Sequence, residues 1–520
     1  MFMPPISAFN KRHDTPLPLP DLSLDHTSWE EEEEEEEEEE LRTPGIILRL
    51  GLFFDGTGNN RDNVAATAQC RRLDLKSCSA SELANIKTTC SKYGFGDFDG
   101  TRFNSVPGTS YGGAPTNVVH LYELYPDHSK SPIDTRTPVA YLKAYVDGIG
   151  TRSGGQDSAV NGQLLGQGET GVLAKVKRAP DLIARQVETF RKHHPGTVIK
   201  GVEFDIFGFS RGAAAARHCA NELLKPGHGA FRPMLQAGRF GPAAMTDVSM
   251  NLIALFDTVA AISDPAHGDF GPGNDINRGI NLYLPPGCAR KVIHLHARDE
   301  YRLNFPLNKV HASHQSIVLP GAHADIGGGY LPQTREQLWM TQPVRATVRD
   351  DETVQASQAW ATAQAQAKRL RNSGIAQTGS VTVQSWRAAG GAGGASGSVS
   401  QDYWICVRME RQVRHELALI PLRVMRELGV RHGVPFAAIA ETDPRFALPA
   451  DLKPIAAHVL QQVTAGKPVT LSASQETLLR SQYIHQSAHW ADTGPYYFSK
   501  PAPNNRRVTF EDRPQKGYPE

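Results

Sequence analysis

The 520-residue sequence has no apolar run that approaches the roughly 18 residues needed to span a membrane. Its N-terminus also lacks the basic and then apolar segments of a secretory signal peptide. None of its six cysteines forms a C-x-x-C pair, so their spacing argues against a zinc site. We therefore expect no transmembrane segment. If the protein leaves the cell, we expect a route that does not use a signal peptide.

The net charge of the whole chain is zero, from 55 basic and 55 acidic residues, but the acidic residues are distributed unevenly. Eleven of the acidic residues form one run, Glu30–Glu40, so the rest of the chain carries 44 acidic against 55 basic residues, a net charge of +11. A basic body suits anionic lipid surfaces or nucleic acid. The glutamate run is expected to be a solvated disordered spacer, or else an intramolecular mask or a handle for a partner.

Composition divides the chain into three parts. Residues 1–44 are Pro-rich and then acidic, which predicts disorder. Residues 45–335 alternate apolar runs with helical stretches, which predicts an α/β fold with a mostly parallel sheet. Residues 336–520 are expected to form a helical cap and a C-terminal segment, with a flexible Gly/Ser-rich loop at 388–400.

Four tryptophans flank or lie within the helix-prone and flexible part of this last region: Trp339, Trp360, Trp386 and Trp404. They are expected either to fill a small helical core or to form a mobile aromatic cap that meets a lipid interface.

The motif G-x-S-x-G at 208–212 follows an apolar run and precedes four alanines. This order predicts a strand, a tight turn and a helix, which is the arrangement of a nucleophile elbow in an α/β-hydrolase fold. Ser210 is therefore the candidate nucleophile. The alternative is an ordinary serine at a strand–helix turn.

In this fold class the acid and then the histidine follow the nucleophile along the chain. Asp257 ends the apolar run 252–256 and is the candidate acid, with a helix N-cap as the alternative role. His323 lies in a glycine-rich loop after another apolar run and is the candidate base, with His485 as its main rival. Further rivals are a pair on a predicted strand and a C-terminal residue: His294, His296 and His489.

An oxyanion hole requires two backbone N–H groups. One is expected from Arg211, directly after the nucleophile, and the other from Gly56 or Thr57 in the turn after the first predicted strand. A plain tight turn is the alternative for this segment, and it does not match the Walker phosphate-binding pattern. Asp55, Asp147 and Asp325 could coordinate a hard cation, but their spacing does not require one, and we predict neither a metal nor a cofactor.

Seven motifs in fixed order resemble the type VI secretion lipase effectors of the first family, which are α/β-hydrolase phospholipases. They are FFDGTGN (53–59), PTNV (115–118), GIGT (148–151), GFSRG (208–212), LFDTV (255–259), DE (299–300) and HADIGGGY (323–330). The resemblance covers roughly residues 45–335. Carried over by motif, it places the catalytic triad on Ser210, Asp257 and His323.

The resemblance implies an antibacterial phospholipase with A2 or A1 activity, secreted from the producer's cytoplasm and acting at the inner membrane in the target cell's periplasm. It further implies three partners: membrane phospholipid, a cognate periplasmic immunity protein and a secretion spike protein. Nucleic acid is not among them. In an oxidising periplasm, Cys70, Cys78 and Cys90 could supply a disulfide. Two other functions remain open: an intracellular esterase acting on small esters, and a catalytically dead hydrolase fold that serves as a scaffold.

Overall fold

The structure is a computed structural model and describes residues 45–516 except 73, 134–137, 159–161, 163–164, 237–239, 241–247, 263–272, 350, 389–399 and 491–498. The glutamate run Glu30–Glu40 and nearly all of the predicted loop at 388–400 therefore lie outside the described residues. From Ile46 onward the chain belongs to one compact unit.

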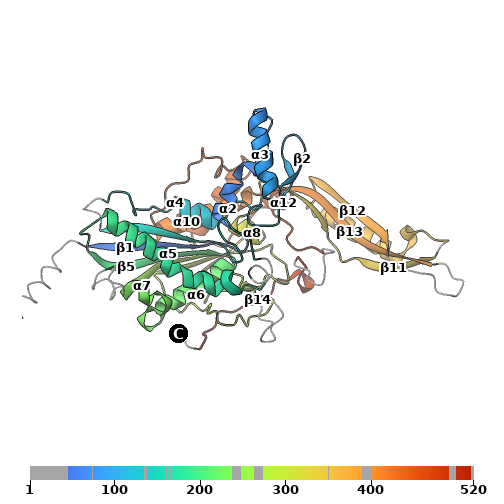
Figure 1. The fold of residues 1–520 in the computed structure, drawn as a ribbon. Helices are drawn as coiled ribbons and strands as arrows, with labels where there is room; N and C mark the ends of the chain where they lie inside the picture. Colours follow the sequence, from blue (N-terminus) through green and yellow to red (C-terminus); the bar gives the residue numbers. More distant parts are fainter. Residues whose placement is uncertain are drawn as a thin grey trace, which may run out of the picture. The chain divides into compact units, whose positions relative to one another are not determined.

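A six-stranded parallel sheet forms the centre of the fold (Figure 1). Its strands, in spatial order, are β4 (Val139–Val146), β1 (Ile46–Phe54), β5 (Ile199–Phe209), β6 (Val248–Phe256), β7 (Lys291–Ala297) and β9 (Gln315–Leu319). The inner strands are buried almost throughout because both faces of the sheet are covered. The predicted α/β class with a mostly parallel sheet is confirmed.

Helices cover the two faces of this sheet (Figure 1). Helices α5 (Val172–His193) and α6 (Arg211–Leu224) pack on one face, where alternate β1 residues such as Leu50 and Leu52 join their core. The opposite face buries Phe53 and Phe207 against α4 (Asn117–Leu124) and three C-terminal helices, α10 (Leu419–Arg431), α11 (Lys453–Thr464) and α12 (Ala473–Gln482). Part of the C-terminal third thus completes the layer over the central sheet.

A second, antiparallel sheet occupies much of the region predicted to be a helical cap. It consists of β10 (Gln333–Trp339), β11 (Val344–Arg349), β12 (Gly379–Arg387) and β13 (Ser400–Arg414), and the first three all pair with β13. The expected helix is present only as α9 (Gln358–Asn372), which holds the Ala/Gln-rich segment. The helical prediction is therefore wrong for the flanking segments, whose alternating apolar and polar residues suit half-buried strands.

Three of the four tryptophans lie on this antiparallel sheet and are half-buried. Trp339 of β10 stacks on Trp386 of β12 with ring centroids 5.1 Å apart, and Trp386 pairs in register with Trp404 of β13. These three tryptophans therefore lie on strands and not within a small helical core. Trp360 lies on α9, which packs on the same sheet.

Apart from the 13-residue helix α3, the remaining helices and strands are short. They are α2 (Arg61–Ala66), α3 (Ala80–Lys92), β2 (Gly96–Phe98), β3 (Phe103–Ser105), α7 (Arg232–Gln236), β8 (Leu307–Asn308), α8 (His323–Gly327) and β14 (Thr509–Phe510), which pairs in parallel with β8. Within the described residues, no helix combines the length and the apolar character required to cross a membrane.

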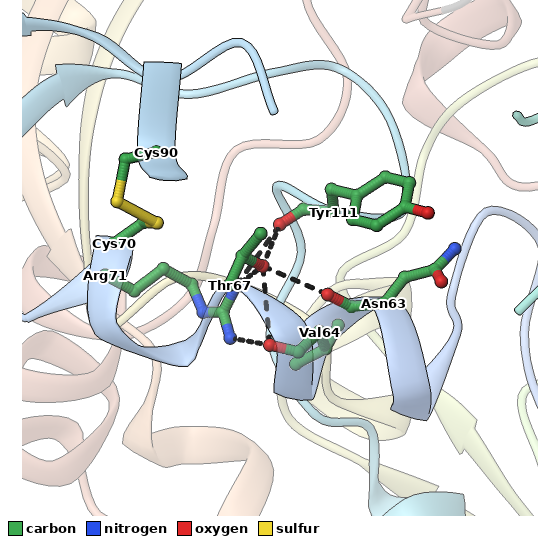
Figure 2. The surroundings of a disulfide bond; sticks show 7 residues. All are labelled: Asn63, Val64, Thr67, Cys70, Arg71, Cys90 and Tyr111. Carbon is green, nitrogen blue, oxygen red and sulfur yellow. Dashed lines mark hydrogen bonds between the residues drawn. A yellow bond between two sulfur atoms is a disulfide. The ribbon is translucent and has the colours of Figure 1, made fainter. Parts of the chain in front are cut away.

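A disulfide joins Cys70 to Cys90, which resolves the pairing among the three clustered cysteines and leaves Cys78 as a free thiol (Figure 2). The bond ties the short segment after α2 to the end of α3, within a small core of its own. Next to it, Arg71 donates to the Thr67 hydroxyl at 2.7 Å and fixes the same segment from the other side.

Candidate active site

Ser210 lies in a sharp turn between β5 and α6, with φ 59° and ψ −128°. This backbone conformation is rare for a residue with a side chain, and it persists only where the surroundings enforce it. Two glycines allow the turn to form. A Cβ on Gly208 would come within 2.6 Å of the Gly212 carbonyl oxygen, and a Cβ on Gly212 within 2.2 Å of the Asp55 carbonyl oxygen.

The strand ends bring Ser210, His323 and Asp257 together. The Ser210 Oγ lies 2.8 Å from Nε2 of His323, and Nδ1 of the same ring lies 2.5 Å from Oδ2 of Asp257. Ser210 and Asp257 directly follow β5 and β6, and His323 begins α8 just after β9. Parallel strands present their carboxyl ends at one edge of a sheet, which is why residues 113 and 66 positions apart meet here.

The Asp257 carboxylate is fully buried and accepts hydrogen bonds on both oxygens. Arg507 binds it in a bidentate manner at 2.7 and 2.8 Å, and the backbone N–H of Ala297 donates to Oδ1 at 2.9 Å. Burial alone would raise the pKa of this carboxyl, but the charge of Arg507 and the hydrogen bond from His323 outweigh burial and hold the pKa well below its ordinary value. Asp257 is therefore a carboxylate at neutral pH.

The His323 ring is enclosed between two aromatic rings, those of Phe209 and Phe305, at centroid distances of 4.7 and 5.1 Å. Burial lowers the pKa of His323, and the hydrogen bond and charge of Asp257 offset this effect only in part. The imidazole is consequently neutral at neutral pH. In that state Nδ1–H donates to Asp257, and Nε2 can accept the Ser210 proton.

A cavity of about 330 Å³ opens onto Ser210 and His323. Its lining combines apolar side chains, including Phe209, Phe305 and Val259, with the cationic side chains of Arg211 and Arg302. Among the residues that the structure describes, those that line the cavity include no carboxylate side chain. The cavity can therefore hold an apolar group next to the serine and an anionic group near the arginines.

The predicted oxyanion residues do not all reach this cavity. Thr57 and Arg211 line it, and the Arg211 Nε donates to the Thr57 hydroxyl at 2.8 Å. The Gly56 part of the prediction is not supported, because the Gly56 N–H donates to Oδ1 of Asp55 at 2.8 Å. Gly56 is needed instead for close packing, since a Cβ there would lie 2.5 Å from the Phe209 ring.

Asp55 fixes the turn that carries Thr57. Its carboxyl also accepts hydrogen bonds from the hydroxyls of Thr116 at 2.7 Å and Tyr145 at 2.6 Å. Burial raises the pKa of Asp55 to about 6, although these hydrogen bonds act in the opposite direction. The PTNV and FFDGTGN motifs thus meet in one buried network behind the cavity.

The rival histidines and the candidate metal ligands have other partners. His485 contacts Asp325 through Nδ1 at 2.7 Å and stacks on Tyr330, and the ring nitrogen of buried His294 accepts the Thr258 N–H at 3.0 Å. Asp147 pairs with Lys175 at 2.8 Å. The carboxylates proposed for a hard cation, those of Asp55, Asp147 and Asp325, are each bound separately by protein groups.

Sequence reasoning missed Arg507. Its position in a polar C-terminal stretch gives no signal, because nothing near it in the sequence indicates that it returns to the carboxyl end of β6. Pairing of β14 with β8 brings it there, and these two strands are only two residues long.

The parallel sheet, the elbow after β5 and the Ser–His–Asp geometry at one sheet edge define an α/β-hydrolase fold. No protein-family model matches the sequence, and no curated protein matches it either. Among solved structures, the chain is similar to the Tle1 effector, described in a complex with the VgrG spike of the type VI secretion system. The identity is 28%, the TM-score 0.68, and the match covers 90% of this chain and 94% of that one.

A second solved structure, an uncharacterised protein from Pseudomonas aeruginosa, matches with 17% identity and a TM-score of 0.37 over 88% of this chain and 56% of that one. The match to the Tle1 effector confirms the predicted resemblance to a type VI secretion lipase effector. It also extends beyond the motifs, because it spans nearly the whole chain.

Proposed function

We propose that this chain is an antibacterial phospholipase A delivered by a type VI secretion system. The observation that carries the proposal is the hydrogen-bonded series from Ser210 through His323 to Asp257, which opens onto a cavity with apolar and cationic lining. The similarity to the Tle1 effector along 90% of the chain supports the route of delivery.

In the proposed reaction, His323 removes the hydroxyl proton while the Ser210 Oγ attacks the ester carbonyl. Asp257 holds the ring and stabilises the imidazolium that forms. The backbone N–H groups of Thr57 and Arg211 stabilise the oxyanion. His323 then protonates the leaving alcohol, and water, deprotonated by the same ring, releases the fatty acid from the acyl-enzyme.

The surroundings of the reacting groups favour a phospholipid over a neutral ester. Apolar residues beside Ser210 suit an acyl chain, and the Arg211 guanidinium suits a phosphodiester, whereas Arg302 is already paired with Glu300. Burial lowers the pKa of Arg211 to about 10, which still leaves it cationic at neutral pH. The choice between the A1 and A2 positions then depends on which acyl chain occupies the apolar side.

The proposed site of action is the target cell's periplasm, at the inner membrane. A disulfide between Cys70 and Cys90 suits an oxidising compartment. By analogy with the spike-bound Tle1 effector, a spike protein is the proposed delivery partner. A periplasmic immunity protein that covers the cavity would protect the producer.

The test measures fatty-acid release from phosphatidylethanolamine and phosphatidylglycerol vesicles, with products separated by mass spectrometry. Ser210→Ala should reduce release by about 10⁴-fold or more without changing the circular dichroism spectrum. Ser316→Ala, at an exposed serine on β9, is the matched control and should retain full activity. Hydrolysis retained by the Ser210 variant would refute the assignment.

The two other candidate functions give different results with the wild-type protein. An intracellular esterase would cleave short soluble esters far faster than vesicles and would be harmless when directed to the bacterial periplasm. A dead hydrolase fold would leave Ser210 unlabelled by a fluorophosphonate probe. The ordered Ser210–His323 hydrogen bond of 2.8 Å favours an active enzyme over the scaffold.

A further inference from the structure

A C-terminal segment, residues 499–516, connects the acid to the nucleophile's helix. Arg507 binds Asp257, and five residues later Asp512 binds the fully buried Arg217 of α6 at 2.7 Å. Between them, β14 pairs with β8. We call residues 499–516 the C-terminal strap. The strap contributes Asp512 as a partner for α6, which follows β5, and Arg507 as a partner for Asp257, which follows β6.

We propose that Arg507 is a positioning residue of the hydrolase: it fixes the plane of the Asp257 carboxylate and sets the proton affinity of His323. This role rests on the proposed function, because it concerns the same serine, histidine and aspartate. Arg507 is not among the residues that line the cavity, so it acts through Asp257 and not on the substrate.

The first part of the proposal, that Arg507 fixes the plane of the Asp257 carboxylate, rests on hydrogen-bond geometry. Each Asp257 oxygen accepts one guanidinium N–H, at 2.7 and 2.8 Å, and a second donor: Ala297 N–H on Oδ1 and His323 on Oδ2. A bidentate guanidinium pair fixes a carboxylate in one plane. Without it, the carboxylate can rotate about its Cβ–Cγ bond, and the imidazole loses its fixed orientation toward Ser210.

Arg507 is itself held in place. Its Nε donates to the Phe305 carbonyl at 2.8 Å, and its side chain is only 8% exposed. The Phe305 ring also contacts the His323 ring edge to face. The hydrogen bond to Phe305 and the burial of the side chain thus help to hold the guanidinium against Asp257.

The second part, that Arg507 sets the proton affinity of His323, rests on the charges around the site. Glu300 and Arg302 form a buried ion pair at 2.8 Å beside the His323 backbone and largely cancel each other. On β7, burial lowers the pKa of His296 to about 4 and holds that of His294 well below its ordinary value, so both are neutral at neutral pH. Among the described residues, Arg507 is the only cation that hydrogen-bonds to Asp257 and directly balances its charge.

Removal of this cation has a predictable sign. An uncompensated Asp257 carboxylate would stabilise the His323 imidazolium and raise its pKa, while the pKa of Asp257 itself would rise in its buried setting. Activity requires neutral His323 and ionised Asp257. Both changes therefore move the acidic limb of the activity profile to higher pH.

The experiment measures kcat and KM against pH for a short-chain p-nitrophenyl ester with the wild-type chain, Arg507→Gln and Arg507→Lys. The control is Arg506→Gln, at the neighbouring exposed arginine. For Arg507→Gln we expect the acidic limb of kcat/KM to shift upward by about one pH unit. We also expect kcat to fall by about 10- to 100-fold and KM to change by less than about twofold. Arg506→Gln should match the wild type.

Arg507→Lys separates charge from geometry. It keeps the cation but not the bidentate fork, so the limb should stay near its wild-type position while kcat falls. An unshifted limb in Arg507→Gln, or wild-type kcat in Arg507→Lys, would overturn the proposal. If Arg507→Gln does not fold, the kcat of Arg507→Lys decides.

The rate at which a fluorophosphonate labels Ser210 reports the same acidic limb without an ester substrate. A wild type that is labelled but hydrolyses no phospholipid contradicts the phospholipase assignment, and the Arg507 role is then still judged from the labelling profiles. A wild type that is not labelled at any pH contradicts both.

Discussion

The two sheets of this protein use polar residues in opposite ways. In the parallel sheet, β5 is buried along nearly its whole length, and the reactive side chains follow the strand ends. In the antiparallel sheet, charged residues lie along the strands, as in the exposed pair Arg335 and Glu410. The charges inside the doubly covered sheet are buried and paired, as Arg49 of β1 is with Asp205 of β5 at 2.7 Å, and the groups that line a cavity follow the strand ends. The partly exposed sheet spreads many of its charges over a surface.

The largest functional difference between the two sheets is expected from one glycine substitution in each. Gly212→Ala places a Cβ 2.2 Å from the Asp55 carbonyl oxygen, and Gly379→Ala places one 2.0 Å from the Glu410 carbonyl oxygen. Both should lower the free energy of unfolding by about 1–3 kcal/mol. Only Gly212→Ala should also reduce ester hydrolysis by about 100-fold or more per folded molecule, because it displaces Ser210 from His323.

Stopped assays of a p-nitrophenyl ester, normalised to folded protein by circular dichroism, measure this difference. Equal loss of activity in the two glycine variants would show that the antiparallel sheet and the hydrolytic site are not separable. Equal retention would show that the elbow tolerates a Cβ, contrary to its geometry.

The largest effect on stability alone is expected from a buried ion pair, which lies in the antiparallel sheet. Arg411 of β13 donates to Glu336 at 2.7 Å and to the carbonyl oxygens of Arg480 and Ile484, with its side chain 1% exposed. Arg411→Met leaves the Glu336 carboxylate buried without its cation. We expect a loss of about 3–5 kcal/mol in urea unfolding followed by tryptophan fluorescence, since three tryptophans lie on this sheet.

The double variant Arg411→Met with Glu336→Gln is the control for the buried charge. It should recover part of the stability, because no uncompensated carboxylate remains. A single variant that is as stable as the wild type would show that Glu336 reaches water or binds another cation.

The smallest effect is expected from Arg335 and Glu410, an ion pair that also joins β10 to β13 but lies at the surface. Arg335→Gln removes one cationic partner of Glu410 and leaves Arg408, 3.6 Å away, and both Arg335 and Glu410 are in contact with solvent. Exposed ion pairs contribute little because water screens them. The urea midpoint should equal that of the wild type within error, and a shift comparable to that of Arg411→Met would contradict the burial-based ranking.

The sequence predicted the parallel sheet and the meeting of Ser210, Asp257 and His323 because each depends on a local signal. An apolar run followed by a polar residue identifies a strand end, and parallel strands place such ends at one edge. The catalytic roles of these residues stay a proposal until the variants are measured. The antiparallel sheet was missed because alternation in β11 and β13 is interrupted by the Ala/Gln-rich helix α9, whose composition dominated the prediction.

The other contacts could not be predicted from the sequence because they depend on how the chain packs in three dimensions. The choice of Cys90 over Cys78 as the partner of Cys70 depends on how α3 packs, and the contact between Arg507 and Asp257 spans 250 residues. The occupied Gly56 N–H follows from the rotamer of the buried Asp55. No periodicity or motif in the sequence indicates which partners these groups have.

The bond between Arg507 and Asp257 has a consequence for biosynthesis. Asp257 is translated long before Arg507, so the acid must wait for a late segment of the chain before its surroundings are complete. If Arg507 has the proposed role, a chain that ends before residue 507 would hold Ser210, His323 and Asp257 without the guanidinium that fixes the carboxylate, and it should hydrolyse esters about 10- to 100-fold more slowly. A nascent chain should therefore reach full activity only after the C-terminal strap has left the ribosome and docked.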